Sequence, residues 1–484
     1  MRISEVAKKA VRLLTLERTF TIAAFGIASW QLLVPPVLGL ADNGDFARLM
    51  VHFDLVHASP DRAAHYFGYL DRYYAVNRAE AKRFSPSGVI SSELIFSGVA
   101  FAISRIGGGG FDLVYLGAVH IAAFAACAYF LLVSTKPFAG RMRTTGVVLG
   151  SAVFTDIAYI AYFNSFYAES ATFLFMIVVI ASAYMAMAAE RGRMAWLVTY
   201  FGAIAALLLA KYQNVILLPA FLIFGGLLVK RWGQIRYFHA YLVFALAATY
   251  GGYLYFISSP EAVDDAVLYN SVFNGVLLGS PTPSDDLSQL GLDRGLAKYA
   301  GSTAFQRDSL RFDPVFLRKF RDTVTMGSLF SFYFDHPGRL MGALNRTVGL
   351  AFQTRPALGN YEKSAGYPPL TLSRSWAMWS SIRSVLLPRD LWFVTLIGIL
   401  YLILLGRKWL RARDRLEHLQ LEWSALIALM ALGQLIVITI SDGVSDLIKH
   451  SFLFNVLFDY MLVVLMAHVL NVVLSVSKRE EALA

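Results

Sequence analysis

Long apolar runs recur along the chain, and they constrain its fold more than any other feature. Of the 484 residues, 57% are hydrophobic and only 16% are charged. A helix needs roughly 17 to 25 mostly apolar residues to cross a bilayer. Ten runs approach or reach this length, over 20–40, 111–133, 145–162, 171–189, 194–209, 213–229, 239–258, 389–405, 421–440 and 451–475. The sequence therefore predicts an all-α membrane protein with about ten transmembrane helices.

Basic residues between the runs predict which side of the membrane each loop faces. Short cytoplasmic loops carry an excess of Lys and Arg, and the first run follows five such residues: Arg2, Lys8, Lys9, Arg12 and Arg18. If segment 88–104 were a span, every later basic loop would lie outside. If it is a helix lying in the interface, the basic loops and the tail with Lys478 and Arg479 all lie inside. We therefore expect both termini in the cytoplasm.

Two long loops then fall on the outer side and divide the chain into three parts. The first part, 1–258, is a transmembrane module of seven spans, and its first outer loop, 41–110, carries the interfacial helices. The second part, 259–388, is a long extracytoplasmic loop, and the third, 389–484, holds the C-terminal transmembrane helices. The apolar pattern predicts amphipathic helices in the long loop, over 315–334 and 337–352.

This topology gathers unusual polar residues on the outer side of the membrane. Asp42 and Asp45 come directly after the first apolar run, where carboxylates are costly unless they have a function. Five more polar side chains occupy other outer segments: Glu169, Lys211, Gln213, Lys449 and His450. The two lysines stand in outer loops that otherwise carry almost no Lys or Arg. That isolation favours the binding of an anion such as phosphate.

Carboxylates that face lysines across an outer cavity suit one kind of chemistry. A carboxylate can take the proton of an acceptor hydroxyl, and a lysine or arginine can stabilise the charge on a leaving phosphate. The chain has no Gly-rich phosphate loop of the Walker type and no His-Glu-x-x-His motif, which disfavours ATP-driven chemistry. An outer enzyme would then need an activated donor, and a sugar linked to a lipid phosphate is one.

Four short motifs resemble the membrane glycosyltransferases of the GT-C type. They are Asn43-Gly44-Asp45-Phe46, Tyr167-Ala168-Glu169, Lys211-Tyr212-Gln213 and the segment from Lys449-His450 to Asn455. Gly44-Asp45-Phe46 resembles the Gly-Asp-aromatic element that carries the catalytic base in several of these enzymes. The chain is most similar to bacterial proteins grouped as glycan-biosynthesis hexose transferases. The resemblance spans nearly the whole chain. It rests on the order of the four motifs and on their shared position on the outer side of the membrane.

This resemblance implies a hexosyl- or pentosyltransferase in the bacterial inner membrane with an extracytoplasmic active site. A monosaccharide would pass with inversion from a polyprenyl-phosphate donor to a glycan or glycolipid acceptor, with Asp45 as the general base. The implied substrate-binding residues are Asp42, Arg48, Glu169, Lys211, Gln213, Lys449 and His450. The chain has Asp42-x-x-Asp45 instead of the Asp-x-Asp pair common in metal-dependent relatives. We therefore expect no cofactor, although a divalent metal stays open. The net charge of +10 does not indicate a nucleic-acid partner, because the basic residues cluster in short segments between apolar runs.

Each of these polar residues also has a structural interpretation. Asp42 could cap a short helix, and Arg48 could simply pair with Asp45 three residues earlier. The lone lysines could extend to the membrane interface. Asp156 and Asp459 lie inside predicted spans, where we expect hydrogen-bonded structural roles.

Two other functions would use a similar architecture. A flippase or transporter for a lipid-linked glycan would also line a cavity with outer polar residues. It should contain inverted repeats and broken helices, and the sequence shows no sign of either. A transferase of the O-antigen ligase or polymerase type would instead require a diphosphate-linked donor. A purely structural scaffold would not explain why carboxylates and lysines occur together on the outer side.

Overall fold

The computed structural model describes residues 15–61, 64–85, 88–108, 110–138 and 140–483, with side chains described as far as residue 475. Four of the five basic residues that predict a cytoplasmic N-terminus, Arg2, Lys8, Lys9 and Arg12, lie outside the described residues; the fifth, Arg18, lies in α2. So do the side chains of Lys478 and Arg479. The predicted positions of the two termini relative to the membrane therefore stay predictions.

Each of the ten predicted spans coincides with helical structure. The helices are α2 (Leu16–Leu33), α6 (Leu113–Ser134), α7 (Arg141–Phe154), α8 (Ile157–Ile160), α9 (Glu169–Ala188), α10 (Arg193–Leu208), α11 (Leu218–Trp232), α12 (Ile235–Ile257), α19 (Leu391–Trp409), α20 (Arg415–Ile440) and α22 (Phe452–Leu483). Among the described residues, seven helices are long and apolar enough to cross a membrane. An eighth is added if α7 and the segment Ile157–Phe163, which meet at a bend of 58°, form one broken span.

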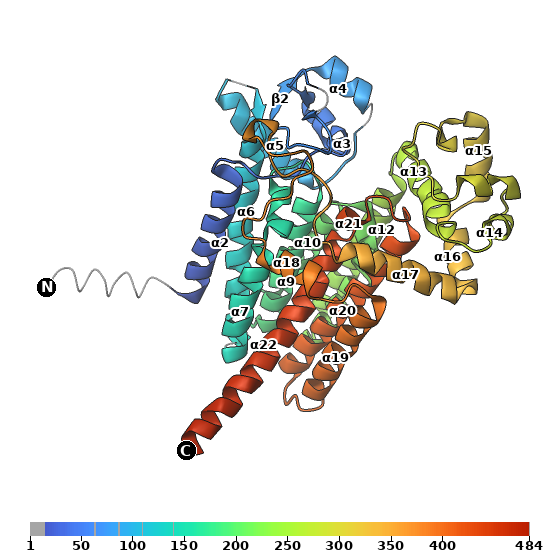
Figure 1. Ribbon diagram of the computed structural model, residues 1–484. Helices are drawn as coiled ribbons and strands as arrows, with labels where there is room; N and C mark the ends of the chain where they lie inside the picture. Colours follow the sequence, from blue (N-terminus) through green and yellow to red (C-terminus); the bar gives the residue numbers. More distant parts are fainter. Residues whose placement is uncertain (1–14, 62–63, 86–87, 109, 139, 484) are drawn as a thin grey trace.

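The predicted count of about ten spans is therefore not confirmed, although the all-α membrane class is. The difference comes from two helices. α10 is apolar but short, and α2 carries Glu17, Arg18 and Gln31 within its 18 residues. Figure 1 shows both packed into the bundle beside the longer helices.

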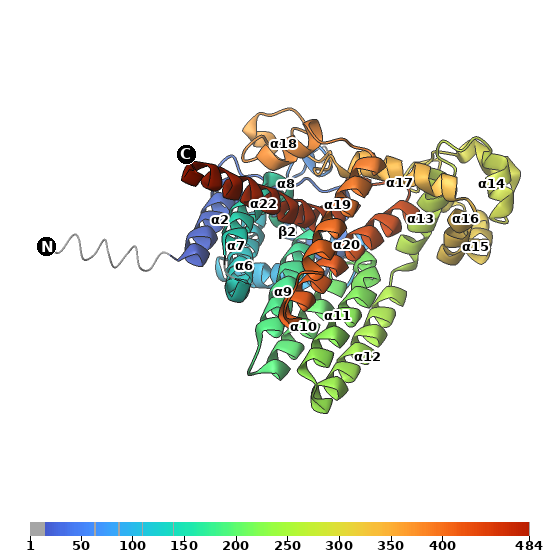
Figure 2. The same ribbon diagram turned by 90° about the horizontal axis from the view of Figure 1, so that it is seen from below.

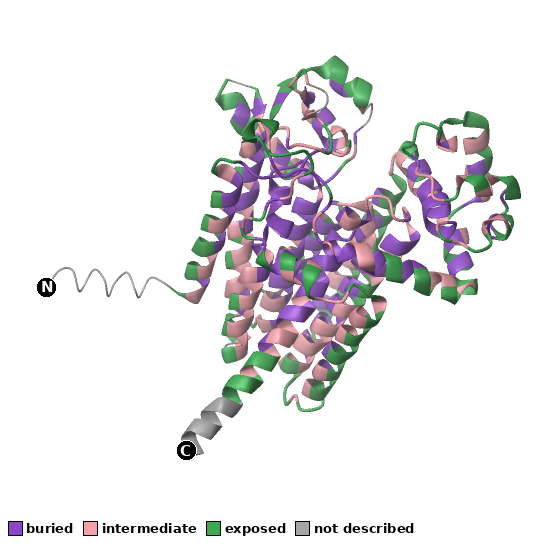
Figure 3. Ribbon diagram, in the orientation of Figure 1, coloured by how far each residue is buried: buried purple, intermediate pink, exposed green. Residues whose placement is uncertain are grey.

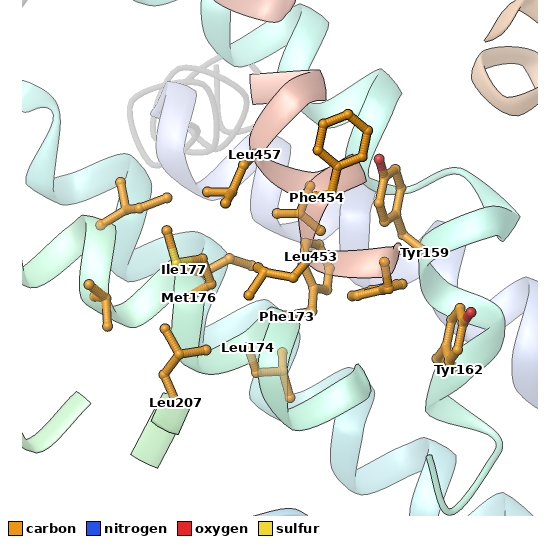
Figure 4. Packing of buried hydrophobic residues seen from close by; sticks show 14 of the residues in the cluster. Tyr159, Tyr162, Phe173, Leu174, Met176, Ile177, Leu207, Leu453, Phe454 and Leu457 are labelled. Carbon is orange, nitrogen blue, oxygen red and sulfur yellow. The ribbon is translucent and has the colours of Figure 1, made fainter. Parts of the chain in front are cut away.

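α9 forms the centre of the bundle, with α6 and α10 against it and α5 (Glu93–Ile106), α20 and α22 also in contact. Most of its side chains are buried, and the centre of the bundle is purple in Figure 3. Phe173 and Ile177 of α9 pack near Leu453 and Leu457 of α22 in the cluster drawn in Figure 4. This apolar centre fixes the ends of α9 and α22, and both helices begin at the same end of the bundle (Figure 2).

The first long loop contains a small β-sheet that the sequence did not predict. Its antiparallel strands, β1 (Leu55–His57), β2 (Tyr73–Val76) and β3 (Phe111–Asp112), pair in the order β1-β2-β3. Aromatic and β-branched residues favour this conformation. The loop also holds α3 (Ala47–Met50), α4 (Arg78–Phe84) and α5 (Glu93–Ile106). The predicted interfacial segment 88–104 thus contains a helix, which begins at the buried Glu93.

The segment 259–388 divides between two hydrophobic cores: its residues from Ala266 to Ala343 form a second core, and those from Leu344 to Trp379 pack into the core of the bundle. Its helices include α13 (Glu261–Ser271), α14 (Pro283–Gln289), α15 (Pro314–Thr323), α16 (Met326–Asp335), α17 (Pro337–Ala351) and α18 (Met378–Val385), with a π-helical turn over Val272–Val276. Tyr269, Phe273, Phe320 and Leu329 lie in the second core. Figure 1 shows α13 to α16 as a lobe beside the bundle. The amphipathic segment predicted over 315–334 is two helices, because Thr325 caps a new one.

Buried ion pairing attaches α18 to the last helix. Arg383 and Asp459 are both fully buried, and an Nη1 to Oδ1 distance of 2.9 Å joins them. Tyr159 and Trp379 also donate to the Asp459 carboxylate, and Asn455 accepts from Arg383. The structural role expected for Asp459 therefore agrees with its surroundings.

Candidate functional site

Asp45 lies at the centre of a charged cluster formed by residues far apart in the sequence. Lys449, which is 404 residues away, donates to one of its carboxylate oxygens, and Arg48 approaches the other at 3.0 Å. The Lys449 ammonium also lies 2.6 Å from Asp446 and 4.8 Å from the centre of the Tyr167 ring. Lys449 is buried, whereas the Asp45 side chain is 27% exposed. The cluster thus presents an accessible carboxylate supported by a buried cation.

The loop that carries Asp45 is fixed by its neighbour Asp42. One oxygen of the buried Asp42 carboxylate accepts from the backbone N–H groups of Gly44 and Phe46, at 2.7 and 3.1 Å. Gly44 has a φ of +102°, which an L side chain rarely adopts and glycine permits. Tyr167 accepts from the Asn43 backbone N–H at 2.9 Å. These contacts give Asp42 a structural role in the loop, but it does not cap the following helix, because the N-cap of α3 is Phe46.

A second charged cluster shares α21 (Leu447–His450) with the first. The buried Glu169, at the first turn of α9, contacts the Lys211 ammonium at 2.7 Å. Lys211 lies 3.5 Å from His450 Nδ1, and His450 Nε2 lies 3.2 Å from Asp442. Because Lys449 and His450 are adjacent, one short helix brings the two clusters together.

Gln213 hydrogen-bonds to the backbone of this second cluster and not to its charged groups. Its amide nitrogen donates to the His450 carbonyl at 3.0 Å and to the Gln434 side chain at 3.1 Å. Gln434 donates back to the Gln213 carbonyl at 3.3 Å. Gln213 therefore fixes α21 against α20.

The lobe formed by α13 to α16 contacts the same site through Asn270. Its side chain donates to Asp442 at 2.6 Å, and its carbonyl oxygen accepts from Ala304 N–H at 2.7 Å. Gly443 has a φ of +57°, and a Cβ there would lie 2.4 Å from the Asn274 carbonyl oxygen. Only glycine permits so close an approach of the two backbones. The lobe thus helps to place Asp442 and, through it, His450.

Mutual attraction keeps the first cluster ionised. Partial burial raises the pKa of Asp45, but Lys449 and Arg48 lower it by more, so that this pKa lies well below its usual range. Burial lowers the pKa of Lys449, but Asp45 and Asp446 raise it well above its usual range. Asp45 is therefore a carboxylate at neutral pH, and its basicity depends on how strongly the two cations hold it.

His57 bridges two carboxylates behind the Asp45 loop. Its Nδ1 lies 2.7 Å from Asp71 and its Nε2 lies 3.4 Å from Asp42. Burial lowers the pKa of His57, but hydrogen bonds to the two carboxylates raise it by more, to about 9. Among the described residues, the one group with metal-ligand spacing is His57, His65 and Asp71. In the structure both ring nitrogens of His57 face carboxylates, and we interpret this arrangement as a charge bridge.

The stabilisation provided by His57 should disappear at high pH. Because its pKa is raised in the folded state, its contribution is complete below about pH 6.5 and is lost as the pH rises through about 9. The contribution at pH 6 should reach up to about 3 kcal/mol. We therefore expect His57→Gln to lower the unfolding temperature more at pH 6 than above pH 9. A difference from wild type that is constant with pH would contradict the charge bridge.

The structure brings most of the predicted site residues to one end of the bundle. Asp45, Arg48 and Lys449 form one cluster, and Glu169, Lys211 and His450 form the other, with Asp42 and Gln213 in supporting positions. Four further residues contact the site. The sequence placed Asn43, Asp442 and Asp446 on the outer side without giving them a role in the site, and it did not indicate Asn270. The spacing of Asp446 and Lys449, three residues apart, could have indicated that pair. No local signal points to Asn270.

The helical bundle and its apolar surface define a multi-pass membrane protein. The chain matches the family described as the YfdI N-terminal transmembrane domain over residues 1–483. The protein therefore belongs to that family. No curated protein and no solved structure matches the chain.

Proposed function

We propose that this protein is a glycosyltransferase of the GT-C type. It would transfer a monosaccharide from a polyprenyl-phosphate donor to a glycan or glycolipid acceptor on the outer side of the bacterial inner membrane. The observation that carries the proposal is the arrangement of Asp45, Lys449 and Arg48. A partly exposed carboxylate held by two cations supplies a proton acceptor and a phosphate-binding pair within one small site.

In the proposed reaction, the acceptor hydroxyl oxygen attacks the anomeric carbon of the donor sugar. The bond between that carbon and the phosphate oxygen breaks, and polyprenyl phosphate leaves with the bonding electrons. Asp45 takes the hydroxyl proton, and Lys449 and Arg48 stabilise the phosphate. When these cations turn to the phosphate they hold Asp45 less strongly, so its pKa rises toward the range in which it accepts a proton well.

The remaining residues have positioning roles in this proposal. Lys211 and His450 would extend the phosphate-binding surface, and Glu169 would orient Lys211 or a sugar hydroxyl. Asp42 and Gln213 would act indirectly, through the loop and through α21. The segment 259–388 would select the acceptor, since its residue Asn270 connects it to the site.

One observation favours a flippase as a second candidate. The bend of 58° between α7 and the segment Ile157–Phe163 is a broken helix at the end of the bundle that holds the site. Transporters use such breaks to bind substrate near the membrane centre, and the sequence did not predict one. The break has a local cause, because Asp156 accepts from Ala158 N–H at 2.9 Å and begins a new helix.

Purified protein in proteoliposomes with polyprenyl-phosphate hexoses, labelled in the sugar, would separate the two functions. A bacterial envelope membrane fraction would supply the acceptor. The transferase would move the label to the acceptor and release polyprenyl phosphate. A flippase would move the intact labelled lipid to the other leaflet.

A further inference from the structure

A half-open cavity of about 450 Å³ lies between helices of the bundle, away from the charged clusters. It is lined mainly by α6, α7, α9 and α22, and most of the side chains around it are apolar. Its volume falls within the range of about 300 to 1,000 Å³ typical of sites for small molecules. Protein interiors are otherwise packed nearly as densely as organic crystals, so a space of this size needs an explanation.

Two glycines of α7 keep the cavity open. Gly146 and Gly150 are four residues apart, so they lie on the same face of the helix, and both line the cavity. A Cβ added at either position would meet nothing within 4 Å. Neither glycine is therefore required for close contact with a neighbouring helix. Their absent side chains instead leave room beside α7.

The cavity is apolar along its length and basic at one end. Arg143 and Lys408 line that end, and Arg143 is neutralised by Glu17 at 2.6 Å. Lys408 is half-buried, and in the part of the chain that the structure describes it has no hydrogen-bond or ion-pair partner. It is also near enough to His468 to act on it electrostatically. One unpaired positive charge thus lies at the mouth of an apolar space.

This basic end lies opposite the candidate site. α7 begins and α19 ends at the end of the bundle farther from α21, as Figure 1 shows. A lipid held by Lys408 therefore has its headgroup at the opposite end from Asp45 and Lys449. The polyprenyl-phosphate donor of the proposed function needs its phosphate beside Lys449. The two lipids would occupy different places.

We propose that the cavity binds one hydrocarbon chain of an anionic membrane phospholipid, with the phosphate of its headgroup against Lys408. The hydrocarbon chains of a bilayer are already out of water, so moving one into the cavity has no dehydration cost. An empty apolar cavity forfeits the dispersion contacts that an inserted chain provides, and Lys408 gains a charge partner. The inference does not depend on the transferase activity, because it concerns lipid binding alone.

Native mass spectrometry of the full-length protein in detergent tests this inference, with phosphatidylglycerol and phosphatidylethanolamine as probes. The wild type should bind one phosphatidylglycerol preferentially. Gly146→Leu and Gly150→Leu fill the space and should weaken that binding by at least about tenfold. Lys408→Gln should remove the preference for phosphatidylglycerol while binding of phosphatidylethanolamine persists. Gly202→Leu is the matched control, because Gly202 also has open surroundings but lies on α10, away from the cavity.

Three results would overturn the inference, provided that each variant unfolds near the wild-type temperature. The first is wild-type binding of phosphatidylglycerol by both Gly146→Leu and Gly150→Leu. The second is an equal loss of binding in Gly202→Leu. The third is displacement of the bound phosphatidylglycerol by polyprenyl phosphate, to the same extent in wild type and in Lys408→Gln. That result would assign the cavity to the polyprenyl chain of the proposed sugar donor.

Discussion

Replacing Asp45 by Asn is expected to slow sugar transfer by about a hundred- to ten-thousandfold. Asn has nearly the same shape as Asp but cannot accept the proton of the acceptor hydroxyl at neutral pH. The substitution also removes the negative charge that holds Lys449 and Arg48. The rate is measured with purified protein and a labelled polyprenyl-phosphate hexose, and the unfolding temperature confirms that the variant is folded.

Asp446→Asn is the matched control, because Asp446 also holds Lys449 but is not the proposed base. It should lower the rate by less than about tenfold, equivalent to a barrier change below about 1.4 kcal/mol. If the two variants lose the same activity, Asp45 only positions Lys449 and is not the base. Full activity in Asp45→Asn would also contradict the assignment.

Arg383→Met is expected to destabilise the fold by about 3 to 5 kcal/mol. Arg383 is the cation paired with Asp459, and both side chains are fully buried. Removing the guanidinium leaves a carboxylate uncompensated inside the protein, which costs more than the lost contact itself. The effect should appear as a lower unfolding midpoint in detergent.

Two further variants separate this cause from a loss of packing. Arg383→Met combined with Asp459→Asn removes both charges and should recover part of the stability. Arg374→Met, at an exposed position nearby, should change the midpoint little. If the double variant is no more stable than Arg383→Met, the destabilisation comes from packing of Arg383 over Phe352 and not from an unpaired charge.

Apolar length predicted where helices form but not where they end. The first predicted span reached Leu40, yet α2 ends at Leu33, because Pro35 and Pro36 cannot continue its hydrogen bonding. The third predicted span breaks near Asp156, whose side chain caps the next helix. Both ends depend on single residues, which a pattern averaged over a whole run does not register.

The site shows a different limit of sequence reasoning. Charge and position indicated that Asp45 and Lys449 share one side of the membrane, and the structure places them in contact. No sequence pattern pairs Asp45 with Lys449 or Glu169 with Lys211, since these contacts depend on how helices pack. The role of Asn270 was invisible for the same reason, because the lobe reaches the site only through tertiary structure.

The most direct test of the proposed function follows the sugar of a labelled polyprenyl-phosphate hexose incubated with wild-type protein in proteoliposomes and the acceptor fraction. The proposal predicts release of polyprenyl phosphate together with a new, inverted glycosidic bond on the acceptor, and loss of both in Asp45→Asn. Transfer of the intact labelled lipid between leaflets with no bond broken would contradict it and establish a flippase.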